Sequence, residues 1–439
     1  MNIYNSIMNH KDLVSVVGLG YVGLPIAVAF AEKGIGVIGF DIDKMKIKRC
    51  LSGNDYTGEV EETLLKRAEI VFTDDEKDLQ KARFHIIAVP TPINQDYTPD
   101  LQPLIRATEA VGRNMKAGSI VVFESTVYPG VTENICCPIL EEQSGLKCGE
   151  DFKIGYSPER INPGDRNHKL SNIVKIVSGC DVEALNQISA VYSIIVEAGT
   201  YRVRNIRTAE AIKVVENAQR DVNIAFINEI SVILERMEID TNEVVDGMNT
   251  KWNALGFRPG IVGGHCIGVD PYYLIYAAER IGSRSDLLKT SRAINDAISN
   301  HIVDYTIKQL VHLDKPFSQC RVCILGFTFK EDCPDIRNTQ VFQIYKHLQE
   351  YGLKPIVSDS VADAAEVRSQ YNIKLVDRKE IRDADCIIFA VAHDEYRRLT
   401  IEDICRMFQQ QSSPRILIDV KGIYSAVKMK DRGFLYWHL

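Results

Sequence analysis

The chain has 439 residues, with 25% charged and 45% hydrophobic side chains, a composition that predicts a globular protein of two or three domains. Its formal net charge of −7 argues against nucleic acid or an anionic membrane surface as a partner. No apolar run is long enough to span a membrane, and the first residues lack the pattern of a signal peptide. Eleven scattered cysteines fit reduced thiols in the cytoplasm better than a disulfide framework.

The first part of the chain alternates apolar strands with helical stretches. The expected strands are residues 14–17, 36–40, 85–89, 119–123, 153–155 and 173–177. This alternation predicts an α/β fold, with a doubly wound, Rossmann-like parallel sheet and helices on both faces.

The middle of the chain is helical. From Thr208 to Met237 there is no glycine or proline, which predicts one long helix. It is apolar on most faces, which suggests burial between domains or subunits; the apolar positions are Ile212, Val215, Val222, Phe226, Ile230 and Ile233. A second helical stretch covers about 286–312.

A second α/β block begins at 322–326, with later strands at 355–358, 386–391 and 415–419. Cys320 and Cys323 lie in its first apolar strand, where core packing is favoured over a metal or redox site. No metal site is expected. The predicted plan is two Rossmann-like domains, 1–204 and 315–439, joined by a long helix and a helical domain, 205–314.

A glycine-rich turn follows the first strand. Gly18-Leu19-Gly20-Tyr21-Val22-Gly23 precedes an apolar helix, the arrangement that places a dinucleotide pyrophosphate at a helix N-terminus. Asp41 ends the next strand, where a carboxylate binds the ribose 2′-hydroxyl and repels a 2′-phosphate. The pattern predicts NAD rather than NADP, although nearby Lys46 weakens the preference slightly. The alternative is a purely structural turn.

Hydroxyl side chains follow two more strands of the same sheet. Thr91 follows the strand 85–89, and Thr126 follows the strand 119–123. Ligands of open α/β sheets bind outside the carboxyl ends of the strands, so both threonines are candidate cofactor contacts. Each is also a candidate helix cap.

One cysteine lies in a glycine-rich frame, Gly263-Gly264-His265-Cys266-Ile267-Gly268-Val269-Asp270. Glycines let the backbone approach a substrate closely, and a thiol can hold an aldehyde covalently. Together with a nicotinamide cofactor site, this cysteine predicts an enzyme that oxidises an alcohol twice, through a thioester, to an acid. The alternative is an inert, packed thiol.

The long helix carries polar side chains on one face. Lys213 and Asn217 are four residues apart, and Arg220 continues the face. Lys213 and Asn217 are candidate donors to a developing oxyanion, or members of an exposed stripe. After another strand, Glu159 is a candidate to position or deprotonate water and Arg160 to meet phosphate; the alternative is a turn with a surface ion pair.

Taken in order, these segments resemble the UDP-glucose/UDP-N-acetylhexosamine 6-dehydrogenase family from about Leu13 to about Tyr424. The motifs that carry the resemblance are 18–23, 89–92, 124–126, 157–160, Lys213 with Asn217, 263–270, 329–332 and 335–337. The resemblance implies an NAD-binding N-terminal domain, a helical dimerisation middle and a C-terminal domain that binds the UDP-sugar substrate. It also implies a homodimer.

The resemblance assigns roles to particular residues. Cys266 would be the nucleophile, with Lys213 and Asn217 at the oxyanion; Thr126, Glu159 and Asp270 would handle water and protons, and which of them is the base stays open. Arg337 would contact the cofactor, Lys330 and Lys421 the substrate, and Lys251 would act from the partner subunit. The remaining expected contacts are Gly18, Gly20, Tyr21, Val22, Gly23, Asp41, Lys46 and Thr91 for the cofactor, and Arg160, Ile161, Arg220, Phe257, Arg258 and Gly263 for the substrate.

The run 256–274 resembles the N-acetylhexosamine branch, and the form with Gly268 is most similar to enzymes of UDP-GlcNAc or UDP-GalNAc. This implies a four-electron oxidation at C6 to the uronic acid for surface polysaccharide synthesis, with UDP-ManNAc or UDP-glucose as alternative substrates. A single-oxidation dehydrogenase would not need Cys266. A non-catalytic NAD-binding protein would need neither Cys266 nor Lys213.

Overall fold

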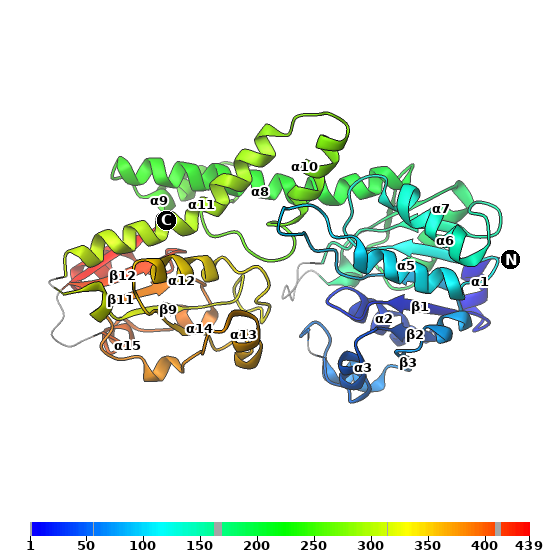
Figure 1. Ribbon diagram of the computed structural model, residues 1–439, viewed down its shortest axis with the longest axis horizontal. Helices are drawn as coiled ribbons and strands as arrows, with labels where there is room; N and C mark the ends of the chain where they lie inside the picture. The colour runs from blue at the N-terminus through cyan, green and yellow to red at the C-terminus, as the bar shows by residue number, and fades with distance from the viewer. Residues whose placement is uncertain (1, 56, 162–168, 314, 409–413) are drawn as a thin grey trace. The chain divides into compact units, whose positions relative to one another are not determined.

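The structure is a computed structural model that describes residues 2–439 except 56, 162–168, 314 and 409–413. The chain folds as two compact units (Figure 1). The first unit runs to Glu216 and includes Tyr272–Ser283; the second comprises Asn217–Pro271 and Arg284–Leu439.

The first unit is built on an eight-stranded sheet of order β3-β2-β1-β4-β5-β6-β7-β8. Its neighbours pair in parallel except β6 and β7, which are antiparallel. The order of the first six strands is that of a dinucleotide-binding sheet, which confirms the predicted fold class. The strands are β1 (Leu13–Val17), β2 (Val37–Phe40), β3 (Ile70–Thr73), β4 (Ala82–Ile87), β5 (Ile120–Phe123), β6 (Lys153–Tyr156), β7 (Lys175–Gly179) and β8 (Thr200–Arg202).

Helices pack against this sheet, α2 on β1 and β2 and α7 on β6 and β7 (Figure 1). The central strands β2, β4 and β5 are buried along almost their whole length, as expected for parallel strands covered on both faces. The helices are α1 (Ile3–Met8), α2 (Gly23–Glu32), α3 (Lys44–Leu51), α4 (Glu62–Arg67), α5 (Gln102–Asn114), α6 (Cys137–Ser144) and α7 (Val182–Tyr192).

Four further helices make up the middle of the chain. The predicted long helix is α8 (Ile206–Arg236), which starts in the first unit and ends in the second; α9 (Thr241–Asn249) follows. The others are α10 (Asp270–Arg280) and α11 (Asp286–Val311). Three of the apolar side chains on α8 are exposed in the single chain: Val215, Phe226 and Ile233. None of the described helices is both long and apolar enough to cross a membrane.

The second unit holds a five-stranded, fully parallel sheet of order β10-β9-β11-β12-β13. Cys320 and Cys323 are buried beside or within β9, as predicted for core packing, and the described residues contain no group suited to hold a metal. The elements are β9 (Val322–Leu325), α12 (Val341–Glu350), β10 (Ile356–Ser358), α13 (Ala364–Tyr371), β11 (Cys386–Phe389), α14 (Asp394–Arg397), α15 (Ile401–Cys405), β12 (Arg415–Asp419), α16 (Ala426–Asp431) and β13 (Phe434–His438).

Candidate active site

The glycine-rich turn has the geometry that a dinucleotide needs. Gly18 has a φ of +95°, and a Cβ there would lie 2.7 Å from the carbonyl oxygen of Ala88. A Cβ on Gly23 would lie 1.8 Å from the carbonyl oxygen of Gly18. Gly20 has no atom within 4 Å of a Cβ position, so its backbone faces open space that a pyrophosphate can enter. Residues 18–23 therefore fit an NAD pyrophosphate, with Tyr21 and Val22 half-buried between the glycines.

Asp41 lies where the sequence predicted, at the end of β2 beside this turn. Its carboxylate accepts hydrogen bonds from the backbone nitrogens of Leu19 and Asp43, each at 2.9 Å. Lys46 Nζ lies 3.4 Å from the same carboxylate. Because Lys46 is paired with Asp41, its charge is balanced in place and offers little attraction to a 2′-phosphate.

The ends of β4 and β5 come together next to the turn. Ser125 Oγ donates to the carbonyl of Val89 at 2.7 Å, and Tyr273 OH donates to the carbonyl of Thr91 at 2.8 Å. Thr91 and Thr126 are both half-buried. β1 and β4 are the neighbours at which the strand order reverses, and a ligand binds in the crevice at such a point.

A buried cluster of charges lies behind this edge, and sequence reasoning missed its centre. Lys175 Nζ donates to Glu124 Oε2 at 2.6 Å and to Glu159 Oε2 at 2.7 Å. Tyr192 OH donates to the other oxygen of Glu124. The side chains of Lys175, Glu124 and Glu159 are 3%, 0% and 7% exposed, so the cluster is shielded from water. The sequence does carry a signal for this buried cluster, namely the lysine within the otherwise apolar strand 173–177.

The two carboxyl groups of the cluster differ in pKa. Burial raises the pKa of Glu124 to about 7, against the opposing effect of Lys175. Burial acts on Glu159 in the same direction, but Lys175 and two backbone N–H groups outweigh it and hold the pKa of Glu159 below its usual range. Glu159 therefore stays ionised, and Glu124 is the group that takes up a proton near neutral pH.

Both carboxylate oxygens of Glu159 are engaged within the first unit. Oε1 accepts from the backbone nitrogens of Arg160 and Ile161 at 2.6 and 2.7 Å, and Oε2 accepts from Lys175. The backbone carbonyl of Glu159 accepts from Lys213 Nζ at 2.8 Å. Lys213 is buried on α8, so this bond holds its ammonium in place.

Arg160 is held by an ion pair. Its Nη2 lies 3.0 Å from Glu216 on α8, and its Nη1 donates to the carbonyl of Val174 at 3.3 Å. For Arg160 the sequence left two alternatives, a phosphate contact or a turn with an ion pair, and the structure shows the ion pair. Ile161, beside it, is half-buried.

In the second unit, Cys266 lies just before α10. Cys266 is half-buried, and its backbone carbonyl accepts a hydrogen bond from the backbone nitrogen of Asp270 at 2.8 Å. A Cβ on Gly264, whose φ is +81°, would lie 2.6 Å from the Phe329 ring, and one on Gly263 would lie 2.8 Å from the carbonyl of Asn338. The glycines are therefore required because this loop packs closely against residues 329–338.

Asn217 and Asp270 meet in the same unit. Asn217 Nδ2 donates to Asp270 Oδ2, and Arg220 donates to Asn217 Oδ1, so the amide is held from both ends. Asp270 and Asn217 are both buried. Lys213 precedes Asn217 by one helical turn on α8, which places the two on one face of the helix.

His265, next to Cys266, belongs to a charged group. Its Nδ1 lies 3.3 Å from Asp335 Oδ2, and Arg337 Nη2 donates to the same carboxylate at 2.6 Å. Burial opposes protonation of His265, but its hydrogen bonds to Asp335 and to Cys266 outweigh burial and raise its pKa to about 9. An imidazolium hydrogen-bonded to a cysteine favours the reactive thiolate. Arg337, expected at the cofactor, is oriented by Asp335.

The remaining substrate candidates are spread over the second unit. Lys421 Nζ lies 3.8 Å from Glu331 Oε1 and close to Gly260, and Lys330 Nζ lies 5.6 Å from the centre of the Phe329 ring. Arg258, by contrast, is exposed and paired with Asp246.

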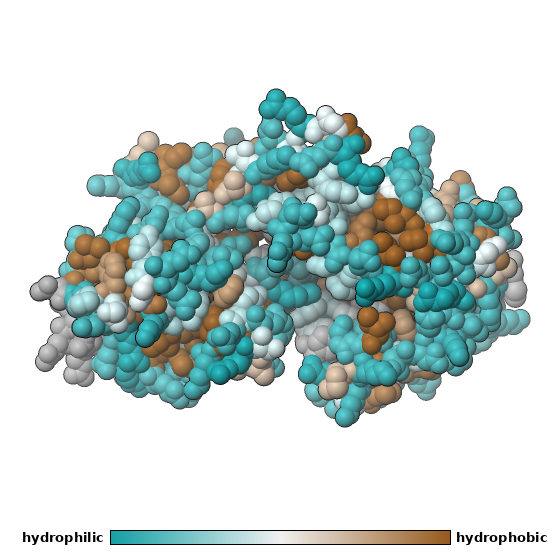
Figure 2. Space-filling view, viewed as in Figure 1, coloured by the Kyte–Doolittle hydropathy of each residue, from teal (hydrophilic) through white to brown (hydrophobic). Residues whose placement is uncertain are grey.

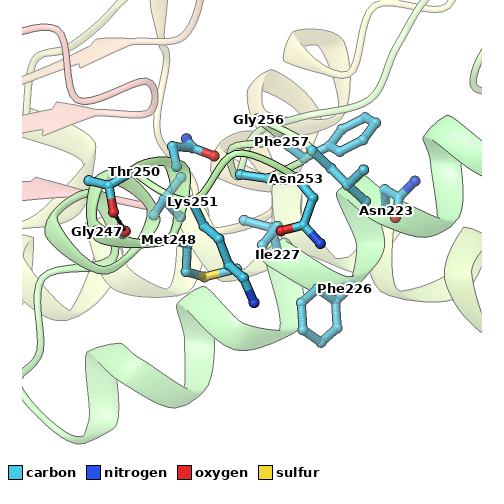
Figure 3. Close-up of a pocket in the computed structure, with 14 residues that line it drawn as sticks. Asn223, Phe226, Ile227, Gly247, Met248, Thr250, Lys251, Asn253, Gly256 and Phe257 are labelled. Atoms are coloured by element: carbon cyan, nitrogen blue, oxygen red, sulfur yellow. Dashed lines mark hydrogen bonds between the residues drawn. The ribbon is translucent and has the colours of Figure 1, made fainter.

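Lys251 and Phe257 lie in a different place in the same unit. They line an open pocket of about 540 Å³ together with Phe226 and Ile227 of α8 (Figure 3). Cys266 and Lys421 are not among the described residues of its wall. Within this pocket, Lys251 of a single chain therefore does not lie beside the loop of Cys266.

Comparisons with known proteins cover almost the whole chain. Family models of the UDP-glucose/GDP-mannose dehydrogenase family match as the NAD binding domain at residues 12–232, the central domain at 207–297 and the UDP binding domain at 323–426. Protein CapL of Staphylococcus aureus is 48% identical over 94% of this chain and 96% of its own. UDP-N-acetyl-D-glucosamine 6-dehydrogenase of Pseudomonas aeruginosa is 46% identical over 94% and 97%.

Solved structures of similar proteins superpose on almost the whole chain. The UDP-D-ManNAc dehydrogenase from Pyrococcus horikoshii superposes with a TM-score of 0.87 at 30% identity, covering 97% of this chain and 98% of its own. The UDP-N-acetyl-mannosamine dehydrogenase Cap5O from Staphylococcus aureus gives a TM-score of 0.81 at 28% identity, covering 97% of both chains.

Proposed function

Because the chain belongs to the UDP-glucose/GDP-mannose dehydrogenase family and takes NAD as its cofactor, we propose that it oxidises the C6 hydroxymethyl of UDP-GlcNAc or UDP-GalNAc to the uronic acid. The substrate assignment rests on two relatives named as UDP-N-acetyl-D-glucosamine 6-dehydrogenases, at 46% and 45% identity. A relative named as a UDP-N-acetyl-D-mannosamine dehydrogenase is 33% identical over a smaller share of the chain. The enzyme is proposed to act in the cytoplasm, and its product to supply the synthesis of a surface polysaccharide.

The observation that carries the chemistry is Cys266 on its tightly packed loop, hydrogen-bonded to His265 and one turn before Asp270. NAD, when bound, accepts hydride from the C6 carbon. In the first oxidation a base removes the O6 proton through water as the C6–H bond breaks, which gives an aldehyde. Lys213 and Asn217 are proposed to donate hydrogen bonds to the developing oxyanion.

In the second oxidation the Cys266 sulfur attacks the aldehyde carbon, and the resulting thiohemiacetal loses a second hydride to become a thioester. Water then cleaves the C–S bond, which releases the acid and restores the thiol. Overall, one alcohol, two NAD⁺ and one water give one carboxylate, two NADH and three protons.

Among the three candidate bases, we favour Asp270 for the final hydrolysis. Both carboxylate oxygens of Glu159 already accept hydrogen bonds, from the backbone nitrogens of Arg160 and Ile161 and from Lys175, so that carboxylate is better suited to hold this turn than to take a proton. Asp270 is buried close to the cysteine in sequence and is oriented by Asn217. Thr126 is proposed to position the water.

We propose a homodimer that covers the apolar surface of α8 and α9. Phe226 and Val215 are 55% and 49% exposed, and Met248 on α9 is 50% exposed. Phe226, Met248 and Lys251 share the open pocket in the second unit (Figure 3). The surface is otherwise mostly hydrophilic with separate apolar patches in the view of Figure 2. Burial of this face by a second chain would place Lys251 at the interface.

The test is NADH formation, followed at 340 nm, with UDP-Glc, UDP-GlcNAc, UDP-GalNAc and UDP-ManNAc. We expect kcat/KM for UDP-GlcNAc or UDP-GalNAc to exceed that for the other two by at least about tenfold, or about 1.4 kcal/mol of transition-state binding. Faster turnover of UDP-Glc or UDP-ManNAc than of both favoured substrates would overturn the assignment. No NADH from any of them would favour a non-catalytic protein.

A further inference from the structure

Three cysteines of the first unit form a cluster that the proposed reaction does not use. Cys137 opens α6, Cys148 follows that helix, and Cys180 follows β7. The Cys148 side chain lies close enough to Cys137 and to Cys180 to shift the pKa of both thiols. Cys137 and Cys148 are half-buried and Cys180 is exposed, so a small solute can reach the cluster.

The backbone explains why Cys148 returns to α6. Gly145, with a φ of +71°, ends the helix, and its nitrogen donates to the carbonyl of Glu141 at 2.9 Å. The backbone nitrogen of Cys148 then donates to Glu141 Oε1 at 3.0 Å. The segment after the helix is therefore tied back to the helix that begins with Cys137.

The sheet brings the third cysteine to the same place. The backbone nitrogen of Cys180 donates to the carbonyl of Ile154 on β6 at 2.9 Å. Cys148 forms a β-bridge with Phe152, two residues before Ile154. These bonds tie the backbone of Cys148 both to the helix that begins with Cys137 and to the strand end beside Cys180, so the fold brings the three segments together.

We propose that Cys137, Cys148 and Cys180 are a disulfide-forming site, oxidised by hydrogen peroxide or another hydroperoxide and separate from Cys266. A cysteine thiolate attacks a peroxide oxygen: the S–O bond forms, the O–O bond breaks, and the leaving oxygen takes a proton. The Cys148 sulfur then attacks the resulting sulfenic acid, an S–S bond forms, and the hydroxyl leaves as water. Two thiols and one hydrogen peroxide give one disulfide and two waters.

The interactions of Cys148 with its two neighbours indicate which thiol reacts first. The neighbouring Cys148 lowers the pKa of Cys137, and the same interaction raises the pKa of Cys148 to about 12. The pKa of Cys180 is also raised, chiefly by its interaction with Cys148. Cys137 is thus the first thiolate to form, although Cys180 is the most exposed of the three. The described residues include no group that meets the geometry of a metal site, which favours a disulfide over a bound ion.

The experiment is peptide mapping of the whole enzyme after titration with hydrogen peroxide and alkylation of the remaining thiols. Trypsin cleaves after Lys147 and Lys153, so Cys137, Cys148 and Cys180 fall in three different peptides. We expect the first disulfide to join Cys148 to Cys137 or to Cys180, with the loss of two free thiols per chain. Without oxidant, we expect Cys137 to be alkylated about tenfold faster than Cys180 near pH 7.5.

A matched pair of variants gives the control. Cys148→Ser should abolish both cross-linked peptides, whereas Cys405→Ser, at another half-buried cysteine, should leave them unchanged. If Cys148→Ser does not fold, mapping of the unmodified enzyme decides alone. A first disulfide at other cysteines, faster alkylation of Cys180 than of Cys137, or zinc that co-purifies and is lost with Cys148→Ser would overturn the proposal. The result is independent of which sugar the enzyme oxidises.

Discussion

Replacing Lys175 with methionine is expected to destabilise the first unit strongly. The ammonium lies 2.6 Å from Glu124 and 2.7 Å from Glu159, and its side chain is 3% exposed. Removing one partner of a buried ion pair costs about 3–5 kcal/mol because the other charge is left without compensation. Here two carboxyl groups lose the same cation, so we expect the upper part of that range, about 4–5 kcal/mol, at pH 8.

The loss should be smaller in acid. Burial raises the pKa of Glu124 to about 7, above its value in an unfolded chain, so the folded protein binds the extra proton. A raised carboxyl pKa means that stability is greatest below the unfolded pKa and falls as pH rises through the folded one. In Lys175→Met, both carboxyl groups lose the cation that favours their charged form, so protonation at pH 5 should relieve part of the penalty.

The assay is urea unfolding at pH 5 and pH 8, together with denaturant-dependent hydrogen exchange of peptides from β5 and β6. Lys153→Met is the matched control: Lys153 lies on β6 and pairs with Asp181 at 2.6 Å, but that partner is 37% exposed. An exposed pair of this kind is worth about 0–1 kcal/mol. Equal losses for the two variants, or a Lys175→Met loss independent of pH, would refute the reasoning.

Three other predictions concern the glycine turn with Asp41 and the loop of Cys266. Asp41→Asn should reduce the preference for NAD over NADP about tenfold, measured as the ratio of kcat/KM values, because the carboxylate no longer repels a 2′-phosphate. Gly23→Ala should unfold the glycine turn and lower the melting temperature without ligand, since its Cβ would lie 1.8 Å from a carbonyl oxygen; Gly20→Ala, in open space, should weaken NAD binding only. Protonation of His265 should add to the free energy of unfolding. This contribution is fully present below the usual histidine pKa of 6.5 and is lost as pH rises through about 9. Asp335→Asn should remove that pH dependence of unfolding and slow thiol alkylation at the neighbouring cysteine.

The parts of the site that depend on local sequence were predicted well. The glycine turn, the position of Asp41 and the long helix α8 all follow from spacing within one strand–helix unit. The edge strands β3 and β8 and the last strand β13 were not predicted. β8 is short and mostly exposed, whereas β3 and β13 contain the apolar runs 70–72 and 434–437, which are as short as a turn of a buried helix and do not by themselves indicate a strand.

The contacts between distant segments could not be predicted. Lys175 follows Glu124 by 51 residues, and their contact depends on the order β5-β6-β7 and on the antiparallel turn into β7. The glycine frame of Cys266 predicts a close approach of substrate to the backbone, and the structure adds a second reason for two of these glycines, Gly263 and Gly264, which pack closely against residues 329–338. Such contacts are set by strand order and loop packing, which carry no signature within the segments themselves.

The central claim is that Cys266 retains the aldehyde between two oxidations. The most direct measurement is the amount of NADH and uronic acid formed per UDP-GlcNAc or UDP-GalNAc consumed, by the unmodified enzyme and by Cys266→Ala. We predict two NADH and one acid per sugar, with loss of steady turnover to the acid in Cys266→Ala while NAD still binds. One NADH per sugar, or two NADH at an undiminished rate from Cys266→Ala, would contradict the covalent mechanism.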